Sequence, residues 1–205
     1  MSFLRICLCA IIVLVAATAC SKVAALPLLA GDATILAFGD SLTFGTGAGD
    51  TESYPAVLAG LTGRKVVNGG VPGEISAVGV QRLPEFLERE RPALLILCHG
   101  ANDLLAHRNH QLIADNLRSM IKIAADRGVP VLLLAVPSPD LMLKPPPLYE
   151  DLSKEFHIPL ERKVLAHILG KRALKSDYIH PNAAGYRLMA EALLGLLKKS
   201  GALPS

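Results

Sequence analysis

Cysteine is scarce in the part of this 205-residue chain that can form a core. Of the four cysteines, Cys7, Cys9 and Cys20 fall within the first 20 positions. Only Cys98 follows them, so an intrachain disulfide framework is excluded for the rest of the chain. The remaining length, about 185 residues, is sufficient for one domain that is stabilised by a packed core instead.

An excess of one charge sign is also missing. The chain has 21 lysine and arginine residues against 18 aspartate and glutamate residues, for a formal net charge of +3. No run of like charges, internal repeat or linker between domains interrupts the sequence. These absences argue against nucleic acid as a partner, and they predict a single domain.

The apolar run Ile6–Ala17 is too short to cross a bilayer, which needs roughly 20 residues. It follows the basic residue Arg5 and leads into small residues before Cys20, a pattern that is typical of secretory signal peptides. We therefore expect residues 1–19 to be a signal peptide and the mature protein to be exported.

The small residues before Cys20 resemble the lipobox of bacterial lipoproteins, in which the cysteine becomes the lipidated first residue. The resemblance implies a lipid anchor on Cys20 that holds the protein to the membrane of the bacterial cell envelope, facing the periplasm, with residues 20–33 as a short tether. Ala17 departs from the leucine that usually begins this motif. The alternative is ordinary secretory cleavage, with Cys20 incidental and the protein secreted.

Beyond this segment, apolar runs of strand length alternate with amphipathic stretches of helix length. The predicted strands are Thr34–Phe38, Lys65–Val67, Leu94–Cys98 and Val131–Val136. The predicted helices are Tyr54–Leu61, Ala77–Glu90, Gln111–Arg127 and Asn182–Lys199. Near-continuous apolar strands are typical of parallel sheets buried on both faces, and the alternation implies right-handed crossovers. The sequence thus predicts an α/β fold over residues 34–200, a three-layer α/β/α sandwich with a central parallel sheet.

The longest irregular stretch, Pro137–Pro147, follows the last predicted strand. Ligand sites of α/β proteins form where strands end, so we expect this stretch to line a substrate mouth. No helix or strand is predicted between residues 141 and 176.

A serine and a distant aspartate–histidine pair carry the predicted chemistry. Ser41 comes shortly after the strand Thr34–Phe38, and Asp177 lies three residues before His180. A serine hydroxyl needs a base to take its proton, and the imidazole base needs a carboxylate to orient it. The three side chains therefore predict a serine hydrolase.

Loops after the second and third predicted strands carry groups that can bind an oxyanion. They are Asn68–Gly73 and His99–Asp103. Glycine lets a backbone N–H approach a ligand closely, and an asparagine amide is a neutral donor. Because parallel strands end at one edge of a sheet, we expect these loops and the Ser41 loop to converge on one oxygen.

Four sequence blocks, in order along the chain, resemble those of the SGNH or GDSL-type hydrolases. The blocks are Gly39-Asp40-Ser41-Leu42, Gly73, Gly100-Ala101-Asn102-Asp103 and Asp177-Tyr178-Ile179-His180-Pro181. Within this family the chain is most similar to the bacterial arylesterase, thioesterase and lysophospholipase branch. The resemblance implies a flavodoxin-like form of the predicted sandwich.

The resemblance also implies a role for each matched residue. Ser41 would be the nucleophile, His180 the general base and then acid, and Asp177 the group that orients the imidazole. The oxyanion hole would consist of the backbone N–H groups of Ser41 and Gly73 and the side chain of Asn102. Such an enzyme hydrolyses a small-molecule or lipid acyl ester through an acyl-enzyme, without a cofactor or metal, and we expect a monomer.

Two departures from the family pattern bear on the substrate. Glu74-Ile75 stands where relatives often have Asp-Thr, and Ala101 replaces a frequent glycine. The same residues would also serve an O-deacetylase of acetyl esters on envelope glycan or polysaccharide. A third alternative is a non-catalytic lipoprotein that binds a ligand in the same cleft.

Each matched residue has a structural interpretation too. Ser41 could be a helix N-cap, Asp177 and His180 a surface pair before a helix, Asn102 a turn cap, and Gly73 a residue that permits a positive-φ turn. Their joint occurrence favours the catalytic interpretation.

Other motifs are incomplete. Gly45–Asp50 is similar to a dinucleotide-binding loop, but an aspartate occupies the third glycine position. His107 and His110 share a helical-turn spacing without a third metal ligand. Thr43 stands where a nucleophile elbow needs its last glycine. We expect His99 to pack at a strand end rather than act as a second base.

Overall fold

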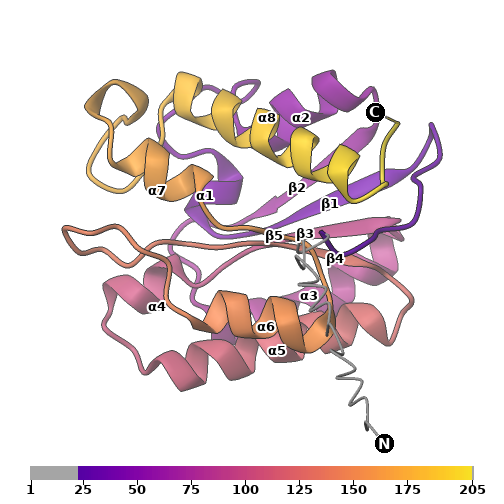
Figure 1. Cartoon of the computed structure of the whole chain (residues 1–205), viewed down its shortest axis with the longest axis horizontal. Coiled ribbons are helices and arrows are strands. Elements are labelled where there is room, and N and C mark those ends of the chain that lie inside the picture. Colours follow the sequence, from indigo (N-terminus) through magenta and orange to yellow (C-terminus); the bar gives the residue numbers. More distant parts are fainter. Residues whose placement is uncertain (1–22, 205) are drawn as a thin grey trace, which may run out of the picture.

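The computed structural model describes residues 23–204, so the predicted signal peptide and Cys20 lie outside the described residues. Within this range five strands form one sheet (Figure 1). They are β1 (Thr34–Gly39), β2 (Lys65–Gly70), β3 (Leu94–Cys98), β4 (Val131–Leu134) and β5 (Leu160–Glu161). Their order is β2-β1-β3-β4-β5, and every neighbouring pair is parallel. The predicted fold class is confirmed.

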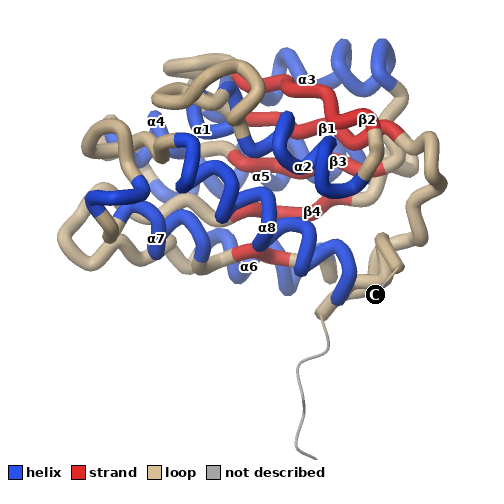
Figure 2. The backbone as a smooth tube through the Cα atoms, turned by 90° about the horizontal axis from the view of Figure 1, so that it is seen from above, coloured by secondary structure: helices blue, strands red, loops and turns tan. Residues whose placement is uncertain are grey.

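Helices cover both faces of the sheet and complete the three layers (Figures 1 and 2). They are α1 (Ser41–Phe44), α2 (Tyr54–Thr62), α3 (Ser76–Glu90), α4 (Ala101–Leu105), α5 (His110–Ala125), α6 (Leu148–Phe156), α7 (Val164–Leu169) and α8 (Ala183–Lys199). In Figure 1, α2, α7 and α8 lie on one face, and α3, α5 and α6 lie on the other. No helix between residues 23 and 204 combines the length and apolarity that a membrane span needs.

The interior strands show why continuous apolar runs predicted this sheet. Every residue of β3 and β4 is buried, as are Ile35 to Gly39 of β1, because helices pack on both faces. Strand β2 differs, since it lies at the edge of the sheet and exposes Lys65 and Asn68. An edge position tolerates polar side chains that a central strand would not.

The region between residues 141 and 176 contains elements that the sequence did not predict. Helix α6 follows Pro147 and has Glu150 and Asp151 in its first turn, both of which favour a helix start. Strand β5 has two residues, and α7 has six, so neither is long enough for a periodic pattern to emerge. Strand β4 ends at Leu134 rather than at the predicted Val136.

The segment that precedes β1 lies against the domain. The N–H groups of Leu26 and Leu29 donate to the carbonyl oxygens of Ser200 and Ala202 at 2.8 and 2.9 Å, and both leucine side chains are buried. Part of the predicted tether is therefore packed along the C-terminal residues.

Two glycines allow the elements around the end of β1 to pack closely. A Cβ on Gly39 would overlap the Cys98 carbonyl oxygen of β3, and a Cβ on Gly70 would overlap the Phe44 nitrogen of α1. With glycine at both positions, α1 lies against the carboxyl end of β2. The loops that follow β1, β2 and β3 thereby meet at one edge of the sheet, where ligand sites form in this topology.

Candidate active site

Ser41 is the first residue of α1, and the residue before it caps that helix. The Asp40 Oδ1 atom accepts a hydrogen bond from the Leu42 N–H at 3.0 Å. Burial raises the pKa of the Asp40 carboxyl. The alternative interpretation of Ser41 as the N-cap is therefore wrong, because Asp40 provides the cap. The Ser41 hydroxyl is left free for another partner.

That partner is His180, which is 139 residues away in the sequence. The Ser41 Oγ and His180 Nε2 atoms are 3.0 Å apart. On the other side of the ring, His180 Nδ1 lies 2.8 Å from Asp177 Oδ2. The structure thus brings the three predicted side chains together in a continuous series of hydrogen bonds.

The Asp177 carboxylate also organises its own turn. Its Oδ1 atom accepts the backbone N–H groups of Ile179 and His180, each at 2.8 Å. Although partial burial opposes ionisation, hydrogen bonds from the His180 ring and from these N–H groups lower the pKa of Asp177. A carboxylate can only accept, so Nδ1 carries the proton and the neutral ring presents Nε2 as an acceptor to Ser41.

Helix α8 fixes the position of this turn relative to α1. Asn182 caps α8 by accepting the Gly185 N–H at 3.1 Å, and its own N–H donates to the Leu174 carbonyl oxygen at 3.0 Å. From the next turn of the helix, the Tyr186 hydroxyl donates to the Thr46 carbonyl oxygen at 2.8 Å. The start of α8 therefore holds the His180 turn and the segment after Ser41 together.

The two remaining predicted donors follow β2 and β3: Gly73 lies in the loop after β2, and Asn102 lies in the first turn of α4, which follows β3. Gly73 has φ = +77°, a conformation in which a side chain would be strained. The Asn102 Nδ2 group donates to the Glu74 carbonyl oxygen at 2.9 Å, which joins the two segments. An asparagine amide has two N–H groups, so the second can donate to a ligand.

Asp103, next to Asn102, has a structural role. Its buried carboxylate accepts the Ser76 N–H at 2.7 Å and the Ser76 hydroxyl at 3.1 Å, at the start of α3. The Asn116 amide donates to the same hydroxyl at 2.9 Å. These bonds attach the start of α3, which follows the Gly73 loop, to α4 and α5.

The other histidines that the sequence offered lie outside the triad. His99 is fully buried at the end of β3. Its Nδ1 atom accepts the Gly100 N–H, and its Nε2 atom bonds to the Glu74 carboxylate. These contacts agree with the expected packing role. His107 and His110 are exposed. Between residues 23 and 204, no three His, Cys, Asp or Glu side chains gather as they would around a metal ion.

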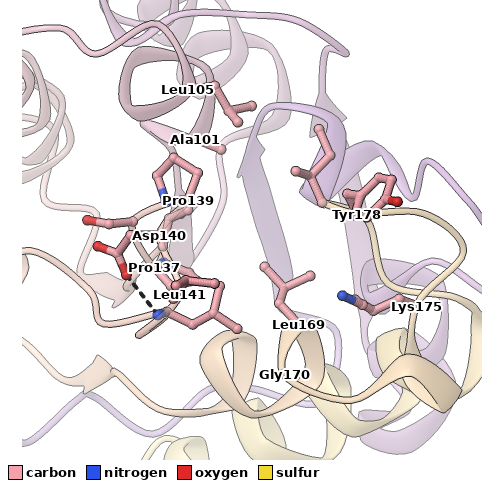
Figure 3. Close-up of a pocket in the computed structure, with 14 residues that line it drawn as sticks. Ala101, Leu105, Pro137, Pro139, Asp140, Leu141, Leu169, Gly170, Lys175 and Tyr178 are labelled. Atoms are coloured by element: carbon pink, nitrogen blue, oxygen red, sulfur yellow. Dashed lines mark hydrogen bonds between the residues drawn. The ribbon is translucent and has the colours of Figure 1, made fainter.

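An open, largely apolar pocket of about 850 Å³ lies beside the segments that carry Asn102 and His180 (Figure 3). Its lining includes Ala101, the neighbour of Asn102, and Ile179, the neighbour of His180. Figure 3 shows Pro137 to Leu141 facing Tyr178 across the opening. The stretch after β4 thus lines the mouth of a pocket, and the volume is within the range of small-molecule sites.

Comparison with known proteins gives one consistent result. A model of the GDSL-like lipase/acylhydrolase family matches residues 37–188. An arylesterase from Vibrio mimicus is 28% identical over 171 residues, which cover 77% of this chain and 84% of the relative. The thioesterase 1/protease 1/lysophospholipase L1 of Escherichia coli strain K12 is 28% identical over 166 residues, which cover 77% and 80%.

Solved structures agree with the sequence matches. The crystal structure of TesA has a TM-score of 0.72 and 28% identity, and the match covers 80% of this chain and 98% of that one. The predicted family resemblance is confirmed by sequence and fold together. Since the family match spans most of the described residues, the chain belongs to the GDSL-like lipase/acylhydrolase family and is a GDSL-type ester hydrolase.

Proposed function

We propose that Ser41, His180 and Asp177 are the catalytic residues of this esterase and that it cleaves acyl esters through an acyl-enzyme. The observation that supports the proposal is the series of hydrogen bonds, at 3.0 and 2.8 Å, from the serine hydroxyl through the imidazole to the carboxylate. In this order the hydroxyl can act as the nucleophile, the imidazole as its base, and the carboxylate as the group that orients the imidazole.

In the first half of the reaction, Ser41 Oγ attacks the ester carbonyl carbon while His180 Nε2 accepts the hydroxyl proton. Asp177 stabilises the imidazolium that forms. The backbone N–H groups of Ser41 and Gly73 and the free amide N–H of Asn102 donate to the oxyanion. His180 then gives its proton to the leaving alcohol. In the second half, a water molecule gives a proton to His180 and attacks the carbonyl carbon of the acyl-enzyme. His180 returns that proton to Ser41 Oγ as the carboxylic acid leaves.

The lining of the pocket favours an apolar substrate. Of its lining residues only Asp140 and Lys175 are charged, and the lining includes the neighbours of Asn102 and His180. We propose that it holds the hydrocarbon part of the ester, an acyl chain of medium length. Each buried methylene would contribute about 0.8 kcal/mol to binding, roughly a fourfold effect.

Narrowing the pocket should therefore change the preferred chain length. Leu105 lines it from the end of α4 and is partly exposed, so a Leu105→Trp substitution can fill space without disturbing the core. If the indole excludes two methylenes, kcat/KM for p-nitrophenyl octanoate should fall about 15-fold. The acetate ester should be cleaved within about twofold of the wild-type rate.

Leu112→Trp provides the matched control, since Leu112 is an exposed leucine on α5 that lies outside the pocket lining. It should leave both rates unchanged. An equal loss for every chain length in Leu105→Trp would contradict the assignment of the pocket. A wild-type enzyme restricted to acetyl esters, with acetylated glycan cleaved fastest, would favour the O-deacetylase alternative.

We also propose that the protein is exported and attached to the bacterial envelope through lipid on Cys20. The sequence pattern from Arg5 to Cys20 supports this. In cells labelled with radioactive palmitate, Cys20→Ala should lose the label and move from the membrane to the soluble fraction. Cys9→Ala, a substitution inside the apolar run, should keep the label and stay in the membrane fraction. An unlabelled, soluble wild-type protein would instead indicate ordinary secretion.

A further inference from the structure

Arg82 of α3 reaches the ends of two strands. Its guanidinium donates to the Gly69 carbonyl oxygen at 2.9 Å and to the Gly39 carbonyl oxygen at 3.4 Å, at the ends of β2 and β1. The charge lies 4.1 Å from the ring centroid of Phe38 and 4.9 Å from that of Phe86. Two aromatic rings therefore hold the guanidinium in place while its N–H groups bond to the strands.

The same guanidinium forms a two-point ion pair with Glu74, the residue after Gly73. Its Nε and Nη2 atoms lie 2.8 and 2.7 Å from the two carboxylate oxygens. The Glu74 side chain is only 3% exposed. Although burial opposes its ionisation, hydrogen bonds from His99 and Arg82 lower the pKa of Glu74, so the group is a carboxylate.

His99 connects this carboxylate to the loop after β3. Its Nδ1 atom accepts the Gly100 N–H at 2.9 Å, so the neutral ring carries its proton on Nε2 and donates it to Glu74 Oε1 at 3.1 Å. The backbone of Glu74 makes a second connection to that loop, because its carbonyl oxygen accepts the Asn102 amide.

Through these contacts one largely buried cluster touches every segment that supplies a proposed oxyanion donor. Arg82 bonds to the end of β1, two residues before Ser41. Glu74 directly follows Gly73, and both Glu74 and His99 bond to the segment that ends in Asn102. No motif in the sequence singled out Arg82, and the cluster forms only when three distant segments meet.

We propose that Arg82, Glu74 and His99 are positioning residues that hold the donors of the oxyanion hole at their correct separations. This inference rests on the proposed function. None of the three contacts the Ser41 hydroxyl. A misplacement of about 1 Å at an active site can reduce the rate about 100-fold, and loss of an entire oxyanion donor about 100- to 1000-fold. Disrupting the cluster should therefore lower kcat roughly 10- to 100-fold and change KM little.

Two substitutions test the cluster while preserving size. Glu74→Gln removes the charge and turns an amide toward Arg82. Arg82→Lys keeps the charge but replaces the planar fork with one ammonium, which lacks the two parallel N–H groups that pair with the Glu74 carboxylate. Both should lower kcat to a similar extent, whereas a purely electrostatic role would be rescued by lysine.

The matched controls come from a second two-point ion pair. Arg118 of α5 donates through Nε and Nη2 to the two carboxylate oxygens of Glu155 on α6, at 2.8 and 3.0 Å, and neither helix supplies a proposed donor. Glu155→Gln and Arg118→Lys repeat the two chemical changes and should leave kcat within about twofold of the wild-type value. His99→Asn is a milder variant, since its Oδ1 can still accept the Gly100 N–H while the link to Glu74 is broken. It should lower kcat in the same way.

A transition-state analogue separates positioning from general instability. A trifluoromethyl ketone forms a tetrahedral adduct with the serine, and its oxygen occupies the oxyanion hole. For Glu74→Gln, Arg82→Lys and His99→Asn, its inhibition constant should rise in parallel with the loss of kcat. All rates are expressed per site titrated to completion with a fluorophosphonate, so that unfolded protein is not counted.

Two results would overturn the inference. One is a kcat per titrated site within about twofold of wild type in Glu74→Gln and His99→Asn. The other is a loss of kcat with an unchanged inhibition constant. Turnover by Ser41→Ala in the same assays would instead reject the proposed function, so the two failures are distinguishable.

Discussion

Replacing Ser41 by alanine should reduce kcat/KM for a short p-nitrophenyl ester by about 10⁴- to 10⁶-fold, while the protein stays folded. The substitution removes the atom that attacks the carbonyl carbon. The helix start is preserved, because Asp40 rather than Ser41 caps α1. The Ser41 side chain bonds to His180 at 3.0 Å, and His180 is itself partly exposed, so water can replace the lost partner.

The measurement is steady-state hydrolysis by purified protein, with thermal unfolding monitored by circular dichroism. Ser53→Ala is a suitable control, because Ser53 is another buried serine close to the end of α1, with no side-chain hydrogen bond to the start of α2. It should retain full activity and react with a fluorophosphonate, whereas Ser41→Ala should not be labelled. Turnover above a few per cent of the wild-type rate in Ser41→Ala would reject Ser41 as the nucleophile.

Replacing Asp177 by asparagine should lower kcat by about 10⁴-fold, more than removing the side chain altogether. An asparagine Oδ1 can still accept the N–H groups of Ile179 and His180, so the turn should keep its shape. Its amide, however, would donate to His180 Nδ1. The ring would then carry its proton on Nε2, where it cannot accept the proton of Ser41.

Asp177→Ala places no donor beside the ring. The Asp177 side chain is half exposed, so water can reach Nδ1 and the productive tautomer remains available. We expect a smaller loss of kcat, about 100- to 1000-fold. Glu161→Gln is the control, since Glu161 Oε1 also accepts two backbone N–H groups, at 2.8 and 2.9 Å, and lies outside the pocket lining, so kcat should stay within about twofold of the wild-type value. If alanine proves as harmful as asparagine, or more so, Asp177 does not act through the tautomer.

The layered fold could be predicted because its signals are local. Central strands must exclude polar side chains from both faces, and the runs that form β1 and β3 therefore stand out in the sequence. Long amphipathic helices show their period, as α3 and α8 do with 15 and 17 residues. The short elements β5 and α7 escaped prediction because their stability comes from tertiary contacts rather than from a pattern of their own.

The candidate site was predictable to the extent that single residue types carry its chemistry. Ser41, Asp177 and His180 have few substitutes in acyl transfer, and Gly73 and Asn102 stand at strand ends where donors are needed. The sequence by itself thus determined which groups are available and that they would meet at one edge of a parallel sheet. It could not determine distances, because these depend on how non-local segments pack.

Only the tertiary structure decided that Asp40 caps α1, that His180 Nε2 reaches Ser41, and that His99 faces Glu74. The same holds for the pocket beside the triad and for the cluster around Arg82. A partly buried arginine and a buried glutamate eight residues apart have the same sequence signature as an exposed pair. What distinguishes them is the loss of water around both groups, which requires the rest of the chain to fold over them.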